Sequence, residues 1–402
     1  MSTKKSTKKK STNVHKAIQS DQIVVNGYSE QWLRQDFDWV YPQEIAKKGQ
    51  QVQFGSVVEI CTEQQQCLGM GIYATGEVAV FRYSTHKVAL DKAFFLQRFT
   101  AALQRRKIPQ DTSAWRMVHG ANDDLPGLVI EVWGNCISII LSSESLVPWL
   151  KLWLEVLEAV LDFDIAVGHV RLPNGKQKYL GILKGTLPEQ IEVQELGVQY
   201  WVSPQKSKDA GLFCDMRGLR QFLSDSWTDK TFLNLFCYTG AFSVSAAHHG
   251  AKVCSVDLSK QYLQRAQDNF ELNGLNIQEH DFLEGDCFQI LDRLRRKQEL
   301  FDVVLADPPS FSHSAAGVWA VQKDMKRLVI ACLRVLRPGG RLIISTNHGK
   351  MAPREFAKAI QDAARKEKRR LKLQLNYAPG SDFPAALYFP TARYLKCWVM
   401  EA

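Results

Sequence analysis

The sequence predicts an α/β protein, with a mostly parallel, doubly wound sheet preceded by a small β-barrel and an α+β linker domain. From about residue 205, nearly all-apolar strands alternate with helices, which is typical of a parallel sheet covered on both faces. Before residue 88, short segments rich in Val, Ile, Phe and Tyr lie between Gly-rich or polar turns, as in a small barrel. The 402 residues are enough for about two or three domains.

Composition excludes several classes of protein. The chain is 45% hydrophobic and 23% charged, which rules out collagen, a coiled coil and a wholly disordered chain. The most apolar stretch, residues 146–161, carries Lys151, Glu155 and Glu158 on one helical stripe, so we expect a buried helix and no membrane span. The start of the chain lacks the apolar segment of a secretory signal.

The nine cysteines show neither a CxxC pair nor the Cys/His spacing of a zinc site. We therefore expect free thiols, no metal and a cytoplasmic location. Cys61 and Cys67 are expected to be small buried residues of one hairpin.

Residues 1–22 are predicted to form a disordered basic tail, because residues 1–16 hold six lysines and no acid. Two interpretations of these lysines are equally supported: non-specific attraction to the phosphate backbone of a nucleic acid, and a solvated tail without a function in binding. After the tail, short strands are expected to residue 88, and a helix over 89–107 leads out of this module. Strands within 115–142, the helix at 146–161 and further short strands to 203 complete the linker domain.

Ligands of an open parallel sheet bind outside the carboxyl ends of its strands. The first such strand ends in the segment 234–240, whose single glycine disfavours the pyrophosphate of a dinucleotide and argues against a nicotinamide-dependent oxidoreductase.

Asp257 ends the second strand and could accept hydrogen bonds from both ribose hydroxyls; the alternative is that it caps the next helix. Asp286 ends the third strand, with Cys287 and Phe288 beside it, where it could reach an adenine amino group. A ribosyl-adenine ligand without phosphates fits S-adenosylmethionine.

The fourth strand ends in Asp307-Pro308-Pro309-Ser310-Phe311. Two prolines stop the strand and fix its backbone, so carbonyl groups freed from the sheet are expected to face the pocket. An aromatic ring just beyond can stack on a planar base. This combination indicates methyl transfer to an aromatic nitrogen or an exocyclic amine.

Taken together, these segments resemble the class I S-adenosylmethionine-dependent methyltransferases, and specifically the large-subunit ribosomal RNA methyltransferases with an N-terminal PUA domain. Segment 208–217 is similar to that family's TGxFxDxR pattern, with Ala210 in place of Thr, and NLFCYTGAFSV, SVDLS and DPPSF match three further motifs. Upstream, DWVYP and LGMGIYA look like the PUA module, and NDDLPGL resembles the family's DGLPGL hairpin.

The resemblance implies a PUA-like RNA-binding domain over 23–97, a central α+β domain over 98–204 and a Rossmann-like methyltransferase domain over 205–402. It implies S-adenosylmethionine as cofactor and large-subunit ribosomal RNA as partner, with a monomer and a homodimer both open. The expected cofactor-binding residues are Phe213, Asp215, Arg217, Asn234, Phe236, Tyr238, Thr239, Gly240, Asp257, Leu258, Asp286, Cys287 and Asp307. The expected catalytic residues are Asp307, Pro308, Pro309, Phe311 and Asn347.

One departure from the family bears on the target base. Relatives that make 5-methylcytosine carry a Cys in the strand after the Pro-Gly-Gly turn, because carbon five must be activated by adding a thiolate to the ring. Here Asn347 stands at or next to that position, as in relatives that make 7-methylguanine. We therefore favour a guanine nitrogen. The alternatives are a cytosine-5 enzyme with a relocated thiol, Cys214 or Cys237, and a non-catalytic RNA-binding factor for ribosome assembly. Tyr388 and Phe389 are expected to be core residues or a pocket lid.

Overall fold

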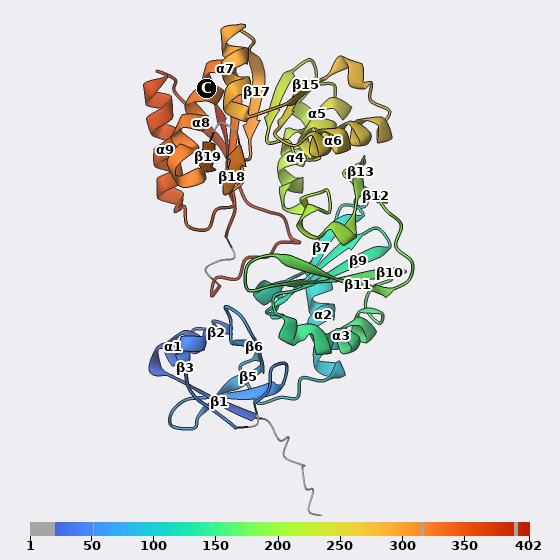
Figure 1. Cartoon of the computed structure of the whole chain (residues 1–402), viewed down its shortest axis with the longest axis vertical. Coiled ribbons are helices and arrows are strands. Elements are labelled where there is room, and N and C mark those ends of the chain that lie inside the picture. Colours follow the sequence, from blue (N-terminus) through green and yellow to red (C-terminus); the bar gives the residue numbers. More distant parts are fainter. Residues whose placement is uncertain (1–20, 51, 315–316, 390–392) are drawn as a thin grey trace, which may run out of the picture.

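The computed structural model describes residues 21–50, 52–314, 317–389 and 393–402, and almost all of the predicted tail lies outside these ranges (Figure 1). The described chain forms an N-terminal, a central and a C-terminal sheet, one after another along the molecule. The helices are α1 (Gly27–Leu33), α2 (Lys92–Gln104), α3 (Leu150–Leu157), α4 (Arg217–Leu223), α5 (Ala241–His248), α6 (Lys260–Leu272), α7 (Cys287–Arg296), α8 (Val321–Val335) and α9 (Pro353–Lys366).

The N-terminal sheet has the strand order β2-β6-β5-β4-β1-β3, and only the β1–β4 pair is parallel. Its strands are β1 (Asp21–Val25), β2 (Trp39–Val40), β3 (Ile45–Lys48), β4 (Val57–Cys61), β5 (Cys67–Tyr73) and β6 (Val80–Ser84). Apolar residues of five of these strands enclose one core with Leu33 of α1.

Two details of this module differ from the sequence prediction. Helix α1 occupies a stretch where we expected strands, because the side chain of Asn26 accepts a hydrogen bond from Ser29 N at 3.0 Å and starts a helix. Cys61 and Cys67 do pair across the β4–β5 hairpin, but only Cys61 is buried. The exposed thiol of Cys67 corrects our expectation for that residue.

The central sheet has the order β11-β10-β9-β8-β7. Its strands are β7 (Ala114–His119), β8 (Leu128–Trp133), β9 (Cys136–Leu141), β10 (Ile165–Arg171) and β11 (Gln177–Lys184). Helix α3 buries its apolar face and exposes Lys151, Glu155 and Glu158, as predicted. Helix α2 crosses the expected boundary at residue 97, and its buried Phe95 and Phe99 belong to a core shared by the N-terminal and central sheets.

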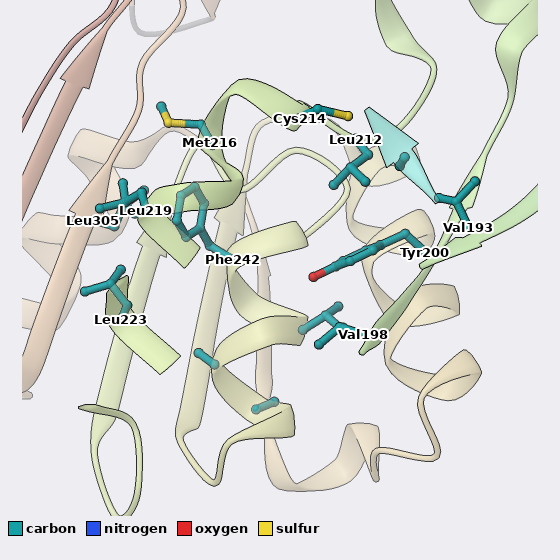
Figure 2. Packing of buried hydrophobic residues seen from close by; sticks show 14 of the residues in the cluster. Val193, Val198, Tyr200, Leu212, Cys214, Met216, Leu219, Leu223, Phe242 and Leu305 are labelled. Atoms are coloured by element: carbon teal, nitrogen blue, oxygen red, sulfur yellow. The ribbon is translucent and has the colours of Figure 1, made fainter. Parts of the chain in front are cut away.

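A hairpin of β12 (Ile191–Glu195) and β13 (Val198–Val202) lies between the central and C-terminal sheets. Its Trp201 N donates to Asn269 Oδ1 of α6 at 2.8 Å. Figure 2 shows the ring of Tyr200 reaching from this hairpin toward α5, where its hydroxyl donates to Ala241 O at 3.2 Å. The hairpin thus packs directly on the helices that follow the first two strands of the C-terminal sheet.

The C-terminal sheet has the order β16-β15-β14-β17-β20-β22-β21; β22 pairs antiparallel with both β20 and β21, and the other four pairs are parallel. Its strands are β14 (Thr231–Leu235), β15 (Lys252–Asp257), β16 (Asp281–Glu284), β17 (Phe301–Ala306), β20 (Leu336–Thr346), β21 (Lys372–Tyr377) and β22 (Lys396–Glu401). One buried cluster joins α4, α5 and α6 to one face, and a second joins α7, α8 and α9 to the other (Figure 1). This arrangement confirms the doubly wound, mostly parallel sheet.

Between β21 and β22, the described chain leaves the C-terminal sheet and contacts both other modules. Asp382 forms an ion pair with Arg217 at 2.5 Å, and Ala386 N donates to Asn122 Oδ1 of the central module at 3.0 Å. The buried ring of Phe389 lies 4.7 Å from the ring of Trp39 in the N-terminal module. Of our two alternatives for Phe389, core residue and pocket lid, the structure therefore shows the first.

Candidate functional site

A cavity of about 600 Å³ opens where β14, β15, β16 and β17 end, the edge at which the sequence predicted a ligand site. Its lining includes twelve of the predicted residues: Phe213, Asn234, Phe236, Tyr238, Asp257, Leu258, Asp286, Cys287, Asp307, Pro308, Pro309 and Asn347. Apart from Phe213, which precedes helix α4, these residues are brought together because the carboxyl ends of the parallel strands meet at one edge of the sheet.

The loop after β14 has an unusual backbone. Phe236 and Tyr238 both adopt positive φ, at 58° and 53°, and Gly240 follows at 75°. A left-handed backbone costs a non-glycine residue about 1–2 kcal/mol, so surrounding contacts must hold the two aromatic residues in place. At Gly240 any side chain is excluded, because a Cβ atom would lie 2.7 Å from Cβ of Ala266. Gly240 therefore shapes the loop from outside the cavity lining.

Asp257 at the end of β15 is held by two backbone groups. Tyr238 N donates to its Oδ2 and Ser259 N donates to its Oδ1, both at 2.9 Å. Helix α6 is capped by Ser259 and not by Asp257, so the capping alternative for this carboxylate is wrong. Burial raises the pKa of Asp257, while the backbone hydrogen bonds from Ser259 and Tyr238 oppose the rise. The result is an oriented acceptor at the cavity wall.

Asp286 has a structural task in addition to its place in the lining. Its Oδ1 accepts hydrogen bonds from Phe288 N at 3.0 Å and Gln289 N at 3.3 Å, which caps helix α7. The cap holds the first turn of α7, including Cys287, against the cavity.

The segment after β17 forms another wall. Burial raises the pKa of Asp307 to about 6. The carbonyl of Pro309, which we expected to face the pocket freely, instead accepts a hydrogen bond from Trp319 Nε1 at 2.7 Å. Ser310 Oγ donates to Asn347 Oδ1 at 3.4 Å and so connects this segment to the exposed end of β20.

Five predicted site residues are not part of the cavity lining. Arg217 is buried and donates to Ala114 O as well as to Asp382, so it joins domains and does not face the cavity. Asp215 accepts from the hydroxyl of Tyr394 at 2.6 Å. These partners lie far away in the sequence, which is why the motif alone placed both side chains at the cofactor.

Of the other predicted residues outside the lining, Thr239 is buried in the protein and Phe311 lies on the exposed surface around the cavity. The hydroxyl of Thr239 is fully buried and donates to Gly211 O at 2.5 Å. Phe311 is 62% exposed, with its ring 5.6 Å from that of His348 in an edge contact. Its free face is accessible to a planar base, but it belongs to the surface around the cavity.

Sequence reasoning missed several lining residues. Arg220 is 2% exposed and forms an ion pair with Glu195 at 2.6 Å, while its guanidinium also donates to Phe213 O at 2.9 Å. Met216 and Phe242, both labelled in Figure 2, line the cavity and belong to the buried cluster behind it. The lining also includes Cys237, which we considered only as a relocated thiol, and five further residues that were not predicted: Ala241, Ser259, Tyr262, Gly285 and Leu305. Arg220 carried a weak sequence signal, because it lies three residues after Arg217, the last residue of the 208–217 motif.

The thiols near the cavity are poor nucleophiles. Burial raises the pKa of Cys214 and of Cys237 far above that of a free cysteine, and it raises that of Cys287 as well. A thiolate, and not a thiol, is the attacking species. Among the described residues, no group of three or more His, Cys, Asp and Glu side chains could hold a metal ion. In the same part of the chain, every helix is too short or too polar to cross a membrane.

Comparison with known proteins identifies the family to which the chain is similar. A family model described as S-adenosylmethionine-dependent methyltransferase matches residues 166–385, and one described as PUA-like domain matches residues 23–83. Ribosomal RNA large subunit methyltransferase I of Alteromonas mediterranea is 28% identical over 95% of this chain and 99% of its own. The protein of that name from Aeromonas salmonicida is 29% identical over 94% and 98%. The crystal structure of SMU.776, complexed with SAH, superposes with a TM-score of 0.85 at 26% identity, over 95% of this chain and all of the other.

The residues at the cavity fit S-adenosylmethionine. The volume of the cavity lies within the usual range of small-molecule sites, about 300–1,000 Å³. The fixed carboxylate of Asp257 suits a ribose, and the rings of Phe213, Tyr238 and Tyr262 provide apolar walls without a phosphate-binding glycine loop. The family model covers more than half of the chain, and the cavity has the matching chemistry. The chain therefore belongs to the S-adenosylmethionine-dependent methyltransferase family and carries a PUA-like N-terminal domain.

Proposed function

We propose that this protein methylates a guanine nitrogen of large-subunit ribosomal RNA without forming a covalent bond to the RNA. The name shared by its relatives from Alteromonas mediterranea and Aeromonas salmonicida supports the RNA class. Action on ribosomal RNA supports a cytoplasmic location for the enzyme. The observation that carries the choice of base is the combination of Asn347 beside Asp307–Pro309 with buried thiols at the same cavity.

When bound, the cofactor supplies a methyl group on a positively charged sulfur, ready to be attacked by an electron pair. Asp257 would orient the ribose by accepting hydrogen bonds from its hydroxyls, and the apolar wall would exclude water from the reacting atoms. Nitrogen seven of guanine already has a lone pair, so no residue has to remove a proton or add to the ring. Positioning and desolvation then suffice for transfer.

We further propose that the target base leaves its stack to enter the cavity between Phe311 and the Asp307–Pro309 backbone. The exposed ring of Phe311 offers a stacking surface for the base. Asp307 is ionised above pH 6, and a carboxylate can accept from both N1–H and N2–H of guanine. The corresponding edge of cytosine presents one amino donor beside an acceptor nitrogen, which matches a carboxylate less well.

The test uses the full chain, labelled S-adenosylmethionine and ribosomal RNA from a strain that lacks the gene. Digestion and mass spectrometry of the labelled nucleoside should identify a methylguanosine. In parallel, RNA containing 5-fluorocytidine should leave no protein–RNA adduct resistant to denaturant, since such a trap requires a thiolate that adds to the ring. Label in 5-methylcytidine, or a trapped adduct lost in Cys237→Ala, would overturn the proposed base. Absence of any labelled nucleoside with cofactor bound would overturn the RNA substrate.

A further inference from the structure

We infer that Trp319 is a positioning residue for methyl transfer, a role that rests on the proposed function and extends it. Trp319 lies on a short hairpin, β18 (Phe311–Ser314) and β19 (Gly317–Ala320), that follows the Asp307–Pro309 segment. The hairpin lies beside helix α8 (Figure 1). The side chain of Trp319 is 7% exposed and does not belong to the cavity lining.

The indole of Trp319 supplies a hydrogen-bond donor that the wall of the cavity lacks. Pro308 and Pro309 have no backbone N–H, so this part of the segment cannot be attached to a neighbouring strand by its own donors. Trp319 Nε1 donates to Pro309 O at 2.7 Å. One residue further on, Val321 N donates to Ser310 O at 3.3 Å. The hairpin and the start of α8 therefore hold the backbone carbonyl groups of Pro309 and Ser310 in place.

The same indole touches two segments on the cofactor side. Its ring lies 6.1 Å from that of Phe236, which lines the cavity after β14 in a left-handed conformation. It also lies 5.9 Å from the ring of Phe288, which follows the lining residues Asp286 and Cys287. One side chain thus contacts the segments that follow three different strands.

This arrangement suits a reaction whose rate depends on alignment. Asp257 and the loop after β14 hold the methyl donor, while the Asp307–Pro309 segment is proposed to hold the base. Trp319 fixes the distance between these two sides. Because misplacing reacting groups by about 1 Å can cost a hundredfold in rate, loosening this contact should lower the rate of transfer more than cofactor affinity.

The test compares Trp319→Phe with Trp398→Phe, both in the full chain. Each substitution removes one indole hydrogen bond from the same domain, since Trp398 Nε1 donates to Asn376 Oδ1 at 3.1 Å at a sheet edge outside the cavity lining. We expect Trp319→Phe to lower the single-turnover rate at saturating RNA and cofactor about tenfold, with the Kd for SAH within twofold of wild type. Trp398→Phe should keep the wild-type rate. Equal rates in the two variants, or a loss confined to Kd, would overturn the inference.

A second measurement separates this inference from the proposed function. In ¹⁵N spectra of the wild-type chain, the indole N–H signal of Trp319, assigned by its absence in Trp319→Phe, should shift when SAH is added. The signal of Trp398 should stay in place. A Trp319 signal insensitive to SAH would overturn the positioning role. Failure of the wild-type enzyme to methylate ribosomal RNA, with this shift present, would overturn only the proposed function.

Discussion

Replacing Asp257 with alanine should weaken cofactor binding about a hundredfold. The carboxylate lines the cavity, is fixed by Tyr238 N and Ser259 N, and is the side chain that we propose to bind the ribose. A hydrogen bond to a charged group contributes about 1.5–3 kcal/mol, so losing two ribose contacts costs about 3 kcal/mol at least. Each 1.4 kcal/mol corresponds to about a factor of ten in affinity, which gives the hundredfold estimate.

The assay is isothermal titration calorimetry with SAH, paired with a control for lost stability. Asp257→Ala also leaves two backbone donors without their acceptor, which alone lowers the free energy of unfolding. Asp302→Ala has a comparable defect at the opposite edge of the sheet, because Asp302 accepts from Thr231 N at 2.9 Å and Thr231 Oγ1 at 2.8 Å. The control should lose stability and keep affinity. Asp257→Ala with affinity within twofold of wild type, or equal losses of affinity in both variants, would refute the ribose assignment.

Four further outcomes are expected. Asp307→Asn should raise the temperature midpoint of unfolding at pH 7.5 but not at pH 4. Burial raises the pKa of Asp307 in the folded state to about 6, so the wild-type protein gains stability as this carboxylate becomes protonated at lower pH. The midpoints would be measured by scanning fluorimetry, and an equal rise at both pH values would contradict the prediction. Cys214→Ala with Cys237→Ala should keep transfer within about threefold, whereas a hundredfold loss would identify a nucleophile. Phe311→Ala should slow transfer about tenfold at unchanged SAH affinity, since base stacking contributes ~1–3 kcal/mol; unchanged turnover would exclude this residue. Deleting residues 1–16 should flatten the salt dependence of RNA binding, and an unaltered slope would make the tail inert.

Much of the C-terminal module could be predicted because its chemistry lies at strand ends. Strands buried on both faces appear as continuous apolar runs, and polar residues directly after such runs must meet at one edge of a parallel sheet. Asp257 and Asp307 each follow a run of this kind, Asp286 follows the short, partly exposed strand β16, and all three line the cavity. Their convergence follows from topology, without knowledge of any distant contact.

Residues inside helices were harder to place, as Arg217 and Arg220 illustrate. Both lie in α4, three positions apart, and only Arg220 lines the cavity. The difference comes from their partners: Asp382 lies 165 positions after Arg217, while Glu195 lies 25 positions before Arg220. A sequence pattern fixes which residues share a helix face, but not which distant carboxylate competes for each guanidinium.

Helix α1 was missed although the sequence held a signal for it. Asn26 is a favourable N-cap, and Glu30 places a negative charge in the first turn. The aromatic and β-branched residues around this segment outweighed those signals, because such residues favour strands. Trp319 is a different case. The contact between its indole and Pro309 depends on the β18–β19 hairpin, and no local sequence pattern predicts that contact.

A transfer that relies on positioning requires the RNA-binding module and the cavity to keep a fixed separation. The chain between β21 and β22 provides such a link, because Asp382 is tied to Arg217 while Phe389 is buried against Trp39 of the N-terminal module. Both contacts are buried, so breaking either one leaves an unpaired charge or an apolar void. Under the proposed function, RNA bound to the PUA-like domain would then be presented to the cavity from a constant distance. In the proposed non-covalent transfer, with the thiols Cys214, Cys237 and Cys287 buried near the cavity, this constant distance would hold the base in place as a covalent bond does in other enzymes.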